Sequence, residues 1–208
     1  RAYMSRDEVQ ARQLLNDAKR LEPSAEIYIL LGRVEANQQR FDSAMEAYQE
    51  ALKLSGGDQK VRLELGVLQL RRGNPADAVD SLRMVLKDDP ANGKAVAALG
   101  DALTNVGKYR DALQVYQRAL RAGRRDTNIL MKSALIQLQQ LNQLPQAVKA
   151  LREVLDQEPQ RAEAHYYLGY AYKDMGRSAD ARRELERFIQ QDPDNELVSE
   201  VQNDLKDL

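Results

Sequence analysis

The sequence predicts an all-α fold of the solenoid type, because two small residues return at a fixed interval along the chain. Glycine recurs at Gly32, Gly66 and Gly100, at intervals of 34 residues, and returns at Gly169 after a further 69. A period of this length indicates a series of similar helical units, each packed only on its neighbours. Alanine keeps the period in a second column, at Ala44, Ala78, Ala112, Ala147 and Ala181.

Within one unit the spacing predicts two antiparallel helices. In the first complete unit Gly32 lies on the first helix, and Ala44, Tyr48 and Ala51 recur at intervals of three and four residues on the second. Small residues at Gly32 and Ala44 allow the two backbones to approach closely, and Tyr48 fills the space beside them. The same columns place five full units at 25–58, 59–92, 93–127, 128–161 and 162–194.

Turn residues fall where pairs of helices need them. Three glycines follow the first helices of their units, where we expect the left-handed conformation that ends a helix. Three prolines follow second helices, because proline cannot continue a helix. These residues are Gly73, Gly107 and Gly176, and Pro90, Pro159 and Pro193.

The two flanking segments resemble partial units. Segment 1–24 matches the second-helix columns, so we expect the parent protein to continue N-terminally with at least one more helix. Segment 195–208 alternates apolar and polar residues, which predicts a capping helix that is apolar inside and polar outside. The alternative is a detachable helix that binds a partner. Its apolar residues are Leu197, Val201, Leu205 and Leu208.

The pattern breaks once. The third unit ends at 122–126 with one extra residue and no proline, and Leu135 stands in the fourth unit where other units have glycine. A leucine at a helix crossing holds two helices further apart than a glycine does. We therefore expect a local change of curvature between Tyr116 and Leu135.

These columns resemble the tetratricopeptide repeat, a 34-residue helix–turn–helix unit. The resemblance covers 25–193 and rests on Leu-Gly pairs such as Leu65-Gly66, a small–aromatic–small second helix and a closing proline. It implies a right-handed superhelix whose first helices line a concave, peptide-binding groove. Family members that grip a C-terminal carboxylate use Lys, Asn and Arg at set positions, and this chain lacks that clamp. The matching positions hold Ile29, Arg33, Val67, Ala97 and Asp101.

The groove that the resemblance implies is unusually apolar in this chain. Leu63, Val67 and Leu70 face it, and Tyr166 and Tyr170 add aromatic anchors. We expect it to bind an apolar peptide or an amphipathic helix of another protein. The alternative is that the terminal helix, or a second copy in a homodimer, fills the groove. The predicted groove residues are Ile29, Arg33, Asn37, Leu63, Val67, Leu70, Arg71, Asp101, Asn105, Lys132, Ile136, Gln140, Tyr166, Tyr170 and Lys173.

A basic cluster lies on the second helix of the third unit and on the residues that follow it. Its arginines could contact an acidic protein, a phosphate or an anionic lipid headgroup. The alternative is a solvated face, because Asp111 and Asp126 flank the cluster. The cluster consists of Arg118, Arg121, Arg124 and Arg125.

Composition argues against several functional classes. The chain has 31 basic and 32 acidic residues, a net charge of −1, which disfavours nucleic-acid binding and the RNA-reading pentatricopeptide repeat. It has no cysteine, and its one histidine, His165, takes a column for bulky packing residues. No phosphate-binding loop or nucleophile elbow occurs. We expect no catalysis, no cofactor and no metal.

The sequence suggests a scaffold or adaptor for protein–protein interaction. The alternative function is a recognition arm of a larger enzyme, or of an assembly, secretion or motility complex, whose other domains lie outside these residues.

No run of 18 apolar residues and no signal-peptide pattern occurs, so we expect no membrane insertion. We expect a cytoplasmic location. A periplasmic location stays open because the sequence starts with Arg1.

Overall fold

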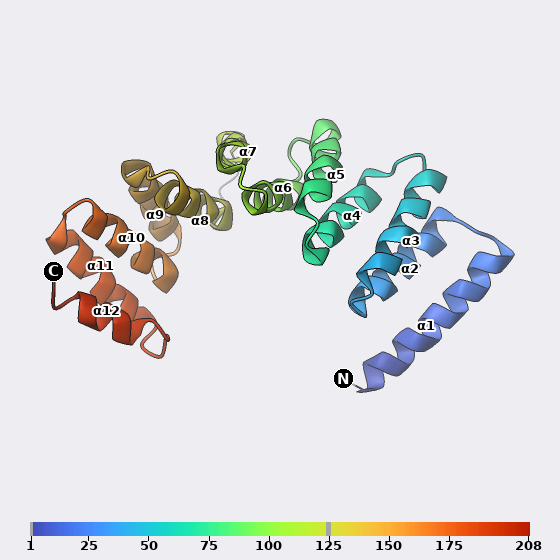
Figure 1. Cartoon of the computed structure of the whole chain (residues 1–208), viewed down its shortest axis with the longest axis horizontal. Coiled ribbons are helices and arrows are strands. Elements are labelled where there is room, and N and C mark those ends of the chain that lie inside the picture. The colour runs from blue at the N-terminus through green and yellow to red at the C-terminus, as the bar shows by residue number, and fades with distance from the viewer. Residues whose placement is uncertain (1, 124–125) are drawn as a thin grey trace. The chain divides into compact units, whose positions relative to one another are not determined.

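The computed structural model describes residues 2–123 and 126–208, and over these residues the chain consists of helices and connecting turns (Figure 1). The all-α class is confirmed. The chain divides into two compact units, 1–108 and 109–208. The helices are α1 Ala2–Leu21, α2 Ala25–Asn37, α3 Phe41–Leu54, α4 Gln59–Arg72, α5 Pro75–Asp88, α6 Gly93–Asn105, α7 Tyr109–Arg121, α8 Thr127–Leu135, the π-helix η1 Ile136–Gln140, α9 Leu144–Gln157, α10 Ala162–Asp174, α11 Ser178–Gln191 and α12 Val198–Asp204.

Consecutive helices pack on one another within each unit. In unit 1, α2 packs on α3, α4 on α5, and α3 and α5 each contact the helix that follows. In unit 2, α8 packs on α9, and α10 packs on both α9 and α11. Stacked helix pairs of this kind give the α-solenoid that the period predicts.

The first and second helices of a pair meet at a glycine. A Cβ built on Gly66 would lie 2.8 Å from Cγ of Leu82, and one built on Gly169 would lie 2.6 Å from Cγ of Leu185. Carbon atoms pack no closer than about 3.5 Å, so a larger residue cannot occupy either position without displacement. The alanine column beside these crossings is fully buried at all five of its positions, from Ala44 to Ala181.

The turns follow the predicted chemistry. Gly73, Gly107 and Gly176 have φ angles of 89°, 75° and 71°, in the left-handed region, which confirms them as helix-ending residues. The second helices α5, α9 and α11 end two residues before their prolines. Asn74 and Gln143 are the N-caps of α5 and α9, each followed closely by a proline in the first turn of the helix.

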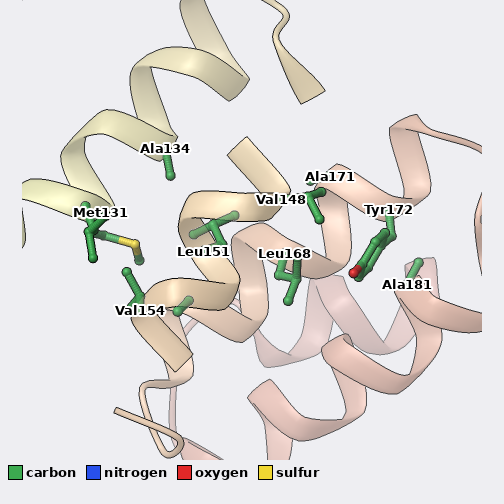
Figure 2. Packing of buried hydrophobic residues seen from close by; sticks show 11 residues of the cluster. Met131, Ala134, Val148, Leu151, Val154, Leu168, Ala171, Tyr172 and Ala181 are labelled. Atoms are coloured by element: carbon green, nitrogen blue, oxygen red, sulfur yellow. The ribbon is translucent and has the colours of Figure 1, made fainter. Parts of the chain in front are cut away.

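The core of unit 2 is a continuous apolar layer contributed by four helices. Figure 2 shows Met131 and Ala134 from α8 facing Leu151 and Val154 from α9, with Leu168 of α10 on the far side of α9. Leu151 and Val154 are fully buried. Burial of side chains of this size is worth about 1.5–3 kcal/mol each, so this layer dominates the cohesion of the unit.

The break in the period lies elsewhere than the sequence suggests. Ala134, which is fully buried in the core with Leu151, takes the small-residue position of the fourth unit, and Leu135 is only half-buried. The expectation that Leu135 stands at the crossing is therefore wrong. The extra residue is taken up by η1, where the amide of Leu141 donates to the carbonyl of Ile136, five residues earlier. A π-helix accommodates one additional residue within a helix.

The single histidine is a structural residue, as its column predicts. His165 is 4 % exposed, and its Nδ1 lies 2.8 Å from Oε2 of Glu184 while its Nε2 lies 3.0 Å from the carbonyl oxygen of Pro159. Burial opposes ionisation of Glu184, but the hydrogen bond with His165 and the charge of Arg187 outweigh it, so the pKa of Glu184 is lowered. The ring thus connects α11 to the turn that precedes α10.

We predict that Gly169→Ala and Leu185→Ala are coupled. Gly169→Ala alone should lower the free energy of unfolding by about 1–3 kcal/mol, because the new methyl group overlaps Leu185. In the Leu185→Ala background, where that side chain is absent, the same change should cost less than about 0.5 kcal/mol. Urea unfolding followed by circular dichroism measures both values. Equal costs in the two backgrounds would contradict the crossing described above.

We predict that His165→Ala lowers the free energy of unfolding by about 1–3 kcal/mol, because it leaves the carboxylate of Glu184 buried without its main partner. Arg187→Ala is the control. Arg187 contacts the same carboxylate but is 51 % exposed, so its loss should cost less than about 1 kcal/mol. Since the pKa of Glu184 is lowered in the fold, its contribution is present near neutral pH and is lost as the pH falls through that lowered pKa. Equal effects of the two variants at pH 7 would contradict this account.

Candidate partner-binding groove

Unit 1 contains a cavity of about 460 Å³ bounded by the first helices α2 and α4 and by the start of α6. We call it the unit 1 pocket. Its volume lies within the range of about 300–1,000 Å³ that is typical of ligand sites. Its lining residues are Arg33, Ala36, Asn37, Tyr48, Lys60, Leu63, Glu64, Val67, Leu68, Arg71 and Lys94.

The register of α4 sets the apolar part of the pocket. Leu63 and Val67 are four residues apart and share one face of the helix, with Arg71 one turn further on. Val67 is 36 % exposed, whereas Leu68 behind it is buried. The start of α4 is fixed by Asp58, whose carboxylate accepts hydrogen bonds from the amides of residues 60 and 61. The apolar face therefore stands open on a well-anchored helix.

A three-residue polar network closes one side of the pocket. Arg33 of α2 binds the carboxylate of Glu64 on α4 with two nitrogens, and its Nε lies 3.0 Å from Oε2. The hydroxyl of Tyr48 on α3 donates to the same carboxylate at 2.8 Å. This network ties three helices together and orients the Arg33 guanidinium over the pocket.

The network also shifts the acidity of its members. Burial alone would raise the pKa of Glu64, but the hydrogen bonds from Arg33 and Tyr48 outweigh burial and lower it. Burial and the hydrogen bond to Glu64 raise the pKa of Tyr48 well above its ordinary value. Glu64 is thus held as a carboxylate and Tyr48 as a neutral hydroxyl near neutral pH.

Several predicted groove residues meet at this pocket, and others do not. Arg33, Asn37, Leu63, Val67 and Arg71 line it. Ile29 is half-buried against the unit 1 core, and Leu70 is half-buried outside the pocket lining. On α6, Asp101 is half-buried and Asn105 is exposed, and neither lines the pocket.

Ala36, which the repeat columns also place on the groove, lines the pocket too, and the five other lining residues were not predicted from the sequence: Tyr48, Lys60, Glu64, Leu68 and Lys94. Tyr48 and Leu68 are mainly packing residues whose edges reach the pocket. Lys60 and Lys94 occupy the same column of consecutive units, 34 residues apart. That shared column was a usable signal, because the second residue of a first helix lies at the mouth of the groove.

In unit 2 most of the predicted groove residues are wholly or partly buried. Ile136 is 5 % exposed, so its predicted place on a partner-binding surface is wrong: it lies ten residues after the N-cap Asp126, in the same packing column as the buried Leu68, which lies ten residues after the N-cap Asp58. Lys132 is half-buried, and Gln140 is exposed on η1.

The C-terminal segment covers the predicted aromatic anchors. Tyr166 and Tyr170 pack with residues of the α12 region in one apolar cluster. The hydroxyl of Tyr170 and the ammonium of Lys173 both donate to Asp204, at 2.8 and 2.9 Å, and these two hydrogen bonds lower the pKa of Asp204. The expectation that these side chains are free for a partner is therefore wrong. Within unit 2 the C-terminal segment packs on these two side chains.

Two residues of the predicted arginine cluster lie in the described part of the chain. Arg118 and Arg121 are exposed on α7, whereas residues 124 and 125 lie outside the described part of the chain.

Within the described residues, no group of His, Cys, Asp or Glu is arranged to hold a metal ion. Over the same residues, none of the helices combines the length and the apolar character needed to cross a membrane.

Comparison with known proteins identifies the repeat. Two family models, both described as tetratricopeptide repeat, match the chain, one over residues 35–90 and 138–205 and the other over 10–59, 63–127 and 97–140. Among solved structures, YrrB, described as "a TPR protein with an unusual peptide-binding site", superposes with a TM-score of 0.76. It is 22 % identical and covers 93 % of this chain and 100 % of its own. At this identity the likeness shows the fold.

Two curated relatives are much longer than this chain. Human protein O-mannosyl-transferase TMTC1 is 25 % identical over 179 residues, which are 85 % of this chain and 20 % of that protein. The BBSome complex member BBS4 of Bos taurus is 26 % identical over 223 residues, covering 91 % of this chain and 43 % of that protein. The chain therefore spans less than half the length of either relative.

We predict that Arg33→Met raises the pKa of Glu64, because burial then acts on a carboxylate that has lost its charged donor. A carbon-detected NMR titration of the Glu64 carboxyl measures this pKa. Arg72→Met is the matched control, since Arg72 pairs with Asp42 in the same unit and does not line the pocket. An unchanged pKa of Glu64 in Arg33→Met would show that the network does not control its charge.

Proposed function

Because the chain belongs to the tetratricopeptide-repeat family, we propose that it is a protein-interaction scaffold that binds an apolar or amphipathic segment of a partner protein in the unit 1 pocket. The observation that carries the proposal is the open apolar face of α4. Val67 is 36 % exposed between Leu63 and Arg71, on a helix whose other faces are packed. Apolar grooves between helices are a common way of holding an amphipathic helix.

The groove of unit 1 supports this proposal better than that of unit 2. In unit 2 the C-terminal segment packs over the corresponding tyrosines, so a partner would have to displace it. In unit 1 the pocket walls are held by the Arg33–Glu64–Tyr48 network, so little reorganisation is needed before binding. YrrB, with its peptide-binding site, supports the idea that this fold can hold a peptide.

A second candidate is a recognition arm of a larger enzyme or assembly. It is favoured by the similarity to TMTC1, a protein named as a transferase, of which the chain covers 20 %. In this role the array itself binds protein and another domain performs the chemistry. A catalytic domain in the same open reading frame would establish this role, and a reading frame confined to repeats would refute it.

We predict that Val67→Glu strongly weakens peptide binding without unfolding the chain. Peptides would be selected from a random 16-residue phage library on the 208-residue chain and measured by fluorescence anisotropy. Because Val67 is partly exposed, the variant should keep its helical circular dichroism and melting temperature, while a carboxylate on the apolar face should weaken binding at least about tenfold.

Leu30→Glu is the matched control, since Leu30 is 41 % exposed on α2 and does not line the pocket. It should leave the affinity unchanged. Failure to select any peptide, or equal losses in both variants, would refute the proposed site. Binding of the chain to itself in the same assay would assign the groove to a homodimer instead.

A further inference from the structure

We propose that the segment bound in the unit 1 pocket carries Asp or Glu beside its apolar anchor, and that Lys60, Lys94 and Arg71 bind these carboxylates. This inference rests on the proposed function and specifies the chemistry of the partner. It concerns the rim of the pocket, whereas the proposed function rests on its apolar face.

The described lining of the unit 1 pocket carries an excess of positive charge. Four cations and one carboxylate are among the described residues that line the pocket, although the whole chain has a net charge of −1. The carboxylate, Glu64, is already bound by Arg33. The positive charge of Lys60, Arg71 and Lys94 is therefore not balanced within the pocket.

These three cations have no acidic partner among the described residues. Lys60 and Lys94 are exposed, and neither side chain has a hydrogen bond or ion pair with a described residue. The guanidinium of Arg71 lies 5.3 Å from the centre of the Phe41 ring, a stacking contact that leaves its donors available. Three cations at one rim repel one another unless an anion lies between them.

Both lysines lie at the starts of their helices. Each is the second residue of its helix, Lys60 on α4 and Lys94 on α6. The helix dipole disfavours a cation there and favours an acid. Asp58 and Asn92 already bind the free amides of these helix starts, so the lysines do not serve as caps. Helix stability therefore gives no reason for lysine in this column, whereas binding of an acidic ligand does.

Unit 2 of the same chain makes a comparable contact at the corresponding positions. In the repeat register, Tyr166 and Tyr170 correspond to Leu63 and Val67. The segment that covers these tyrosines buries Val201 completely and places Asp204 against Tyr170 and Lys173. An apolar residue with an aspartate one turn away is thus the combination that this groove accepts from its own chain.

The two features together define the partner. A uniformly acidic tail would leave Leu63 and Val67 in water, and a purely apolar peptide would leave the three cations unpaired. A segment with an aliphatic or aromatic anchor and carboxylates within one turn of it satisfies both. Rim charges of this kind mainly accelerate association and select the partner, so binding should weaken as salt increases.

The test uses the full 208-residue chain and peptides selected from the random 16-residue library. We expect selected peptides to be enriched in Asp or Glu within four residues of Leu, Ile, Phe or Met. The consensus peptide and a copy with each acid replaced by its amide are then titrated. Lys60→Glu with Lys94→Glu should weaken the acidic peptide about tenfold and leave the amide copy within twofold. Both glutamates suit helix N-termini, so the variant should stay folded.

Lys87→Glu with Lys108→Glu is the matched control. It makes the same change in net charge at exposed lysines of unit 1 outside the pocket, and should alter affinity less than twofold. The inference would be overturned by selected peptides that contain no Asp or Glu, do not bind Val67→Glu, and bind Lys60→Glu with Lys94→Glu as tightly as the unchanged chain. This result would leave the proposed function intact. No selected peptide at all would refute the proposed function. A 20-nucleotide single-stranded RNA that binds with the same lysine dependence would overturn the assignment to an acidic peptide.

Discussion

The close approach of two helices at a small residue underlies every other feature of this molecule. Where Gly66 meets Leu82 and Gly169 meets Leu185, the side chain of the second helix rests directly on the backbone of the first. This contact fixes the separation of the helix pair and leaves the opposite face of the first helix without a neighbour in its own pair. That face of the first helix is therefore not used in holding its own helix pair together.

The two units use that surface differently. In unit 2 the C-terminal segment occupies it, with Val201 buried and Asp204 bound to Tyr170 and Lys173. In unit 1 the corresponding face of α4 stays open beside Lys60 and Lys94. The same face of the first helix is thus covered by the chain itself in unit 2 and open in unit 1. The difference lies in a few side chains, because the backbone plan is shared.

The sequence predicts what depends on spacing and misses what depends on three-dimensional neighbours. The 34-residue columns correctly place the helix crossings and the left-handed glycines, since both follow from helix geometry. An interval of 35 residues shows that one residue is extra but not where it goes, so Ala134 and η1 were unforeseen. Tyr170 was expected to be free because nothing in its own helix reveals that Asp204, 34 residues later, lies against it. Lys60 and Lys94 were not predicted because they lie at helix starts, outside the columns of residues that pack helix on helix.

The π-helix at Ile136–Gln140 bears on how such a gene can change. An additional codon in a helix would ordinarily rotate every later side chain by about 100° and take the apolar face out of the core. Here one widened turn absorbs the residue, and Ala147 and Leu151 of α9 return to the core in register. Counted from the N-cap of one first helix to the next, the fourth unit is thus one codon longer than the unit before it and still packs through the same columns, because the backbone hydrogen bonds of one turn take up the difference.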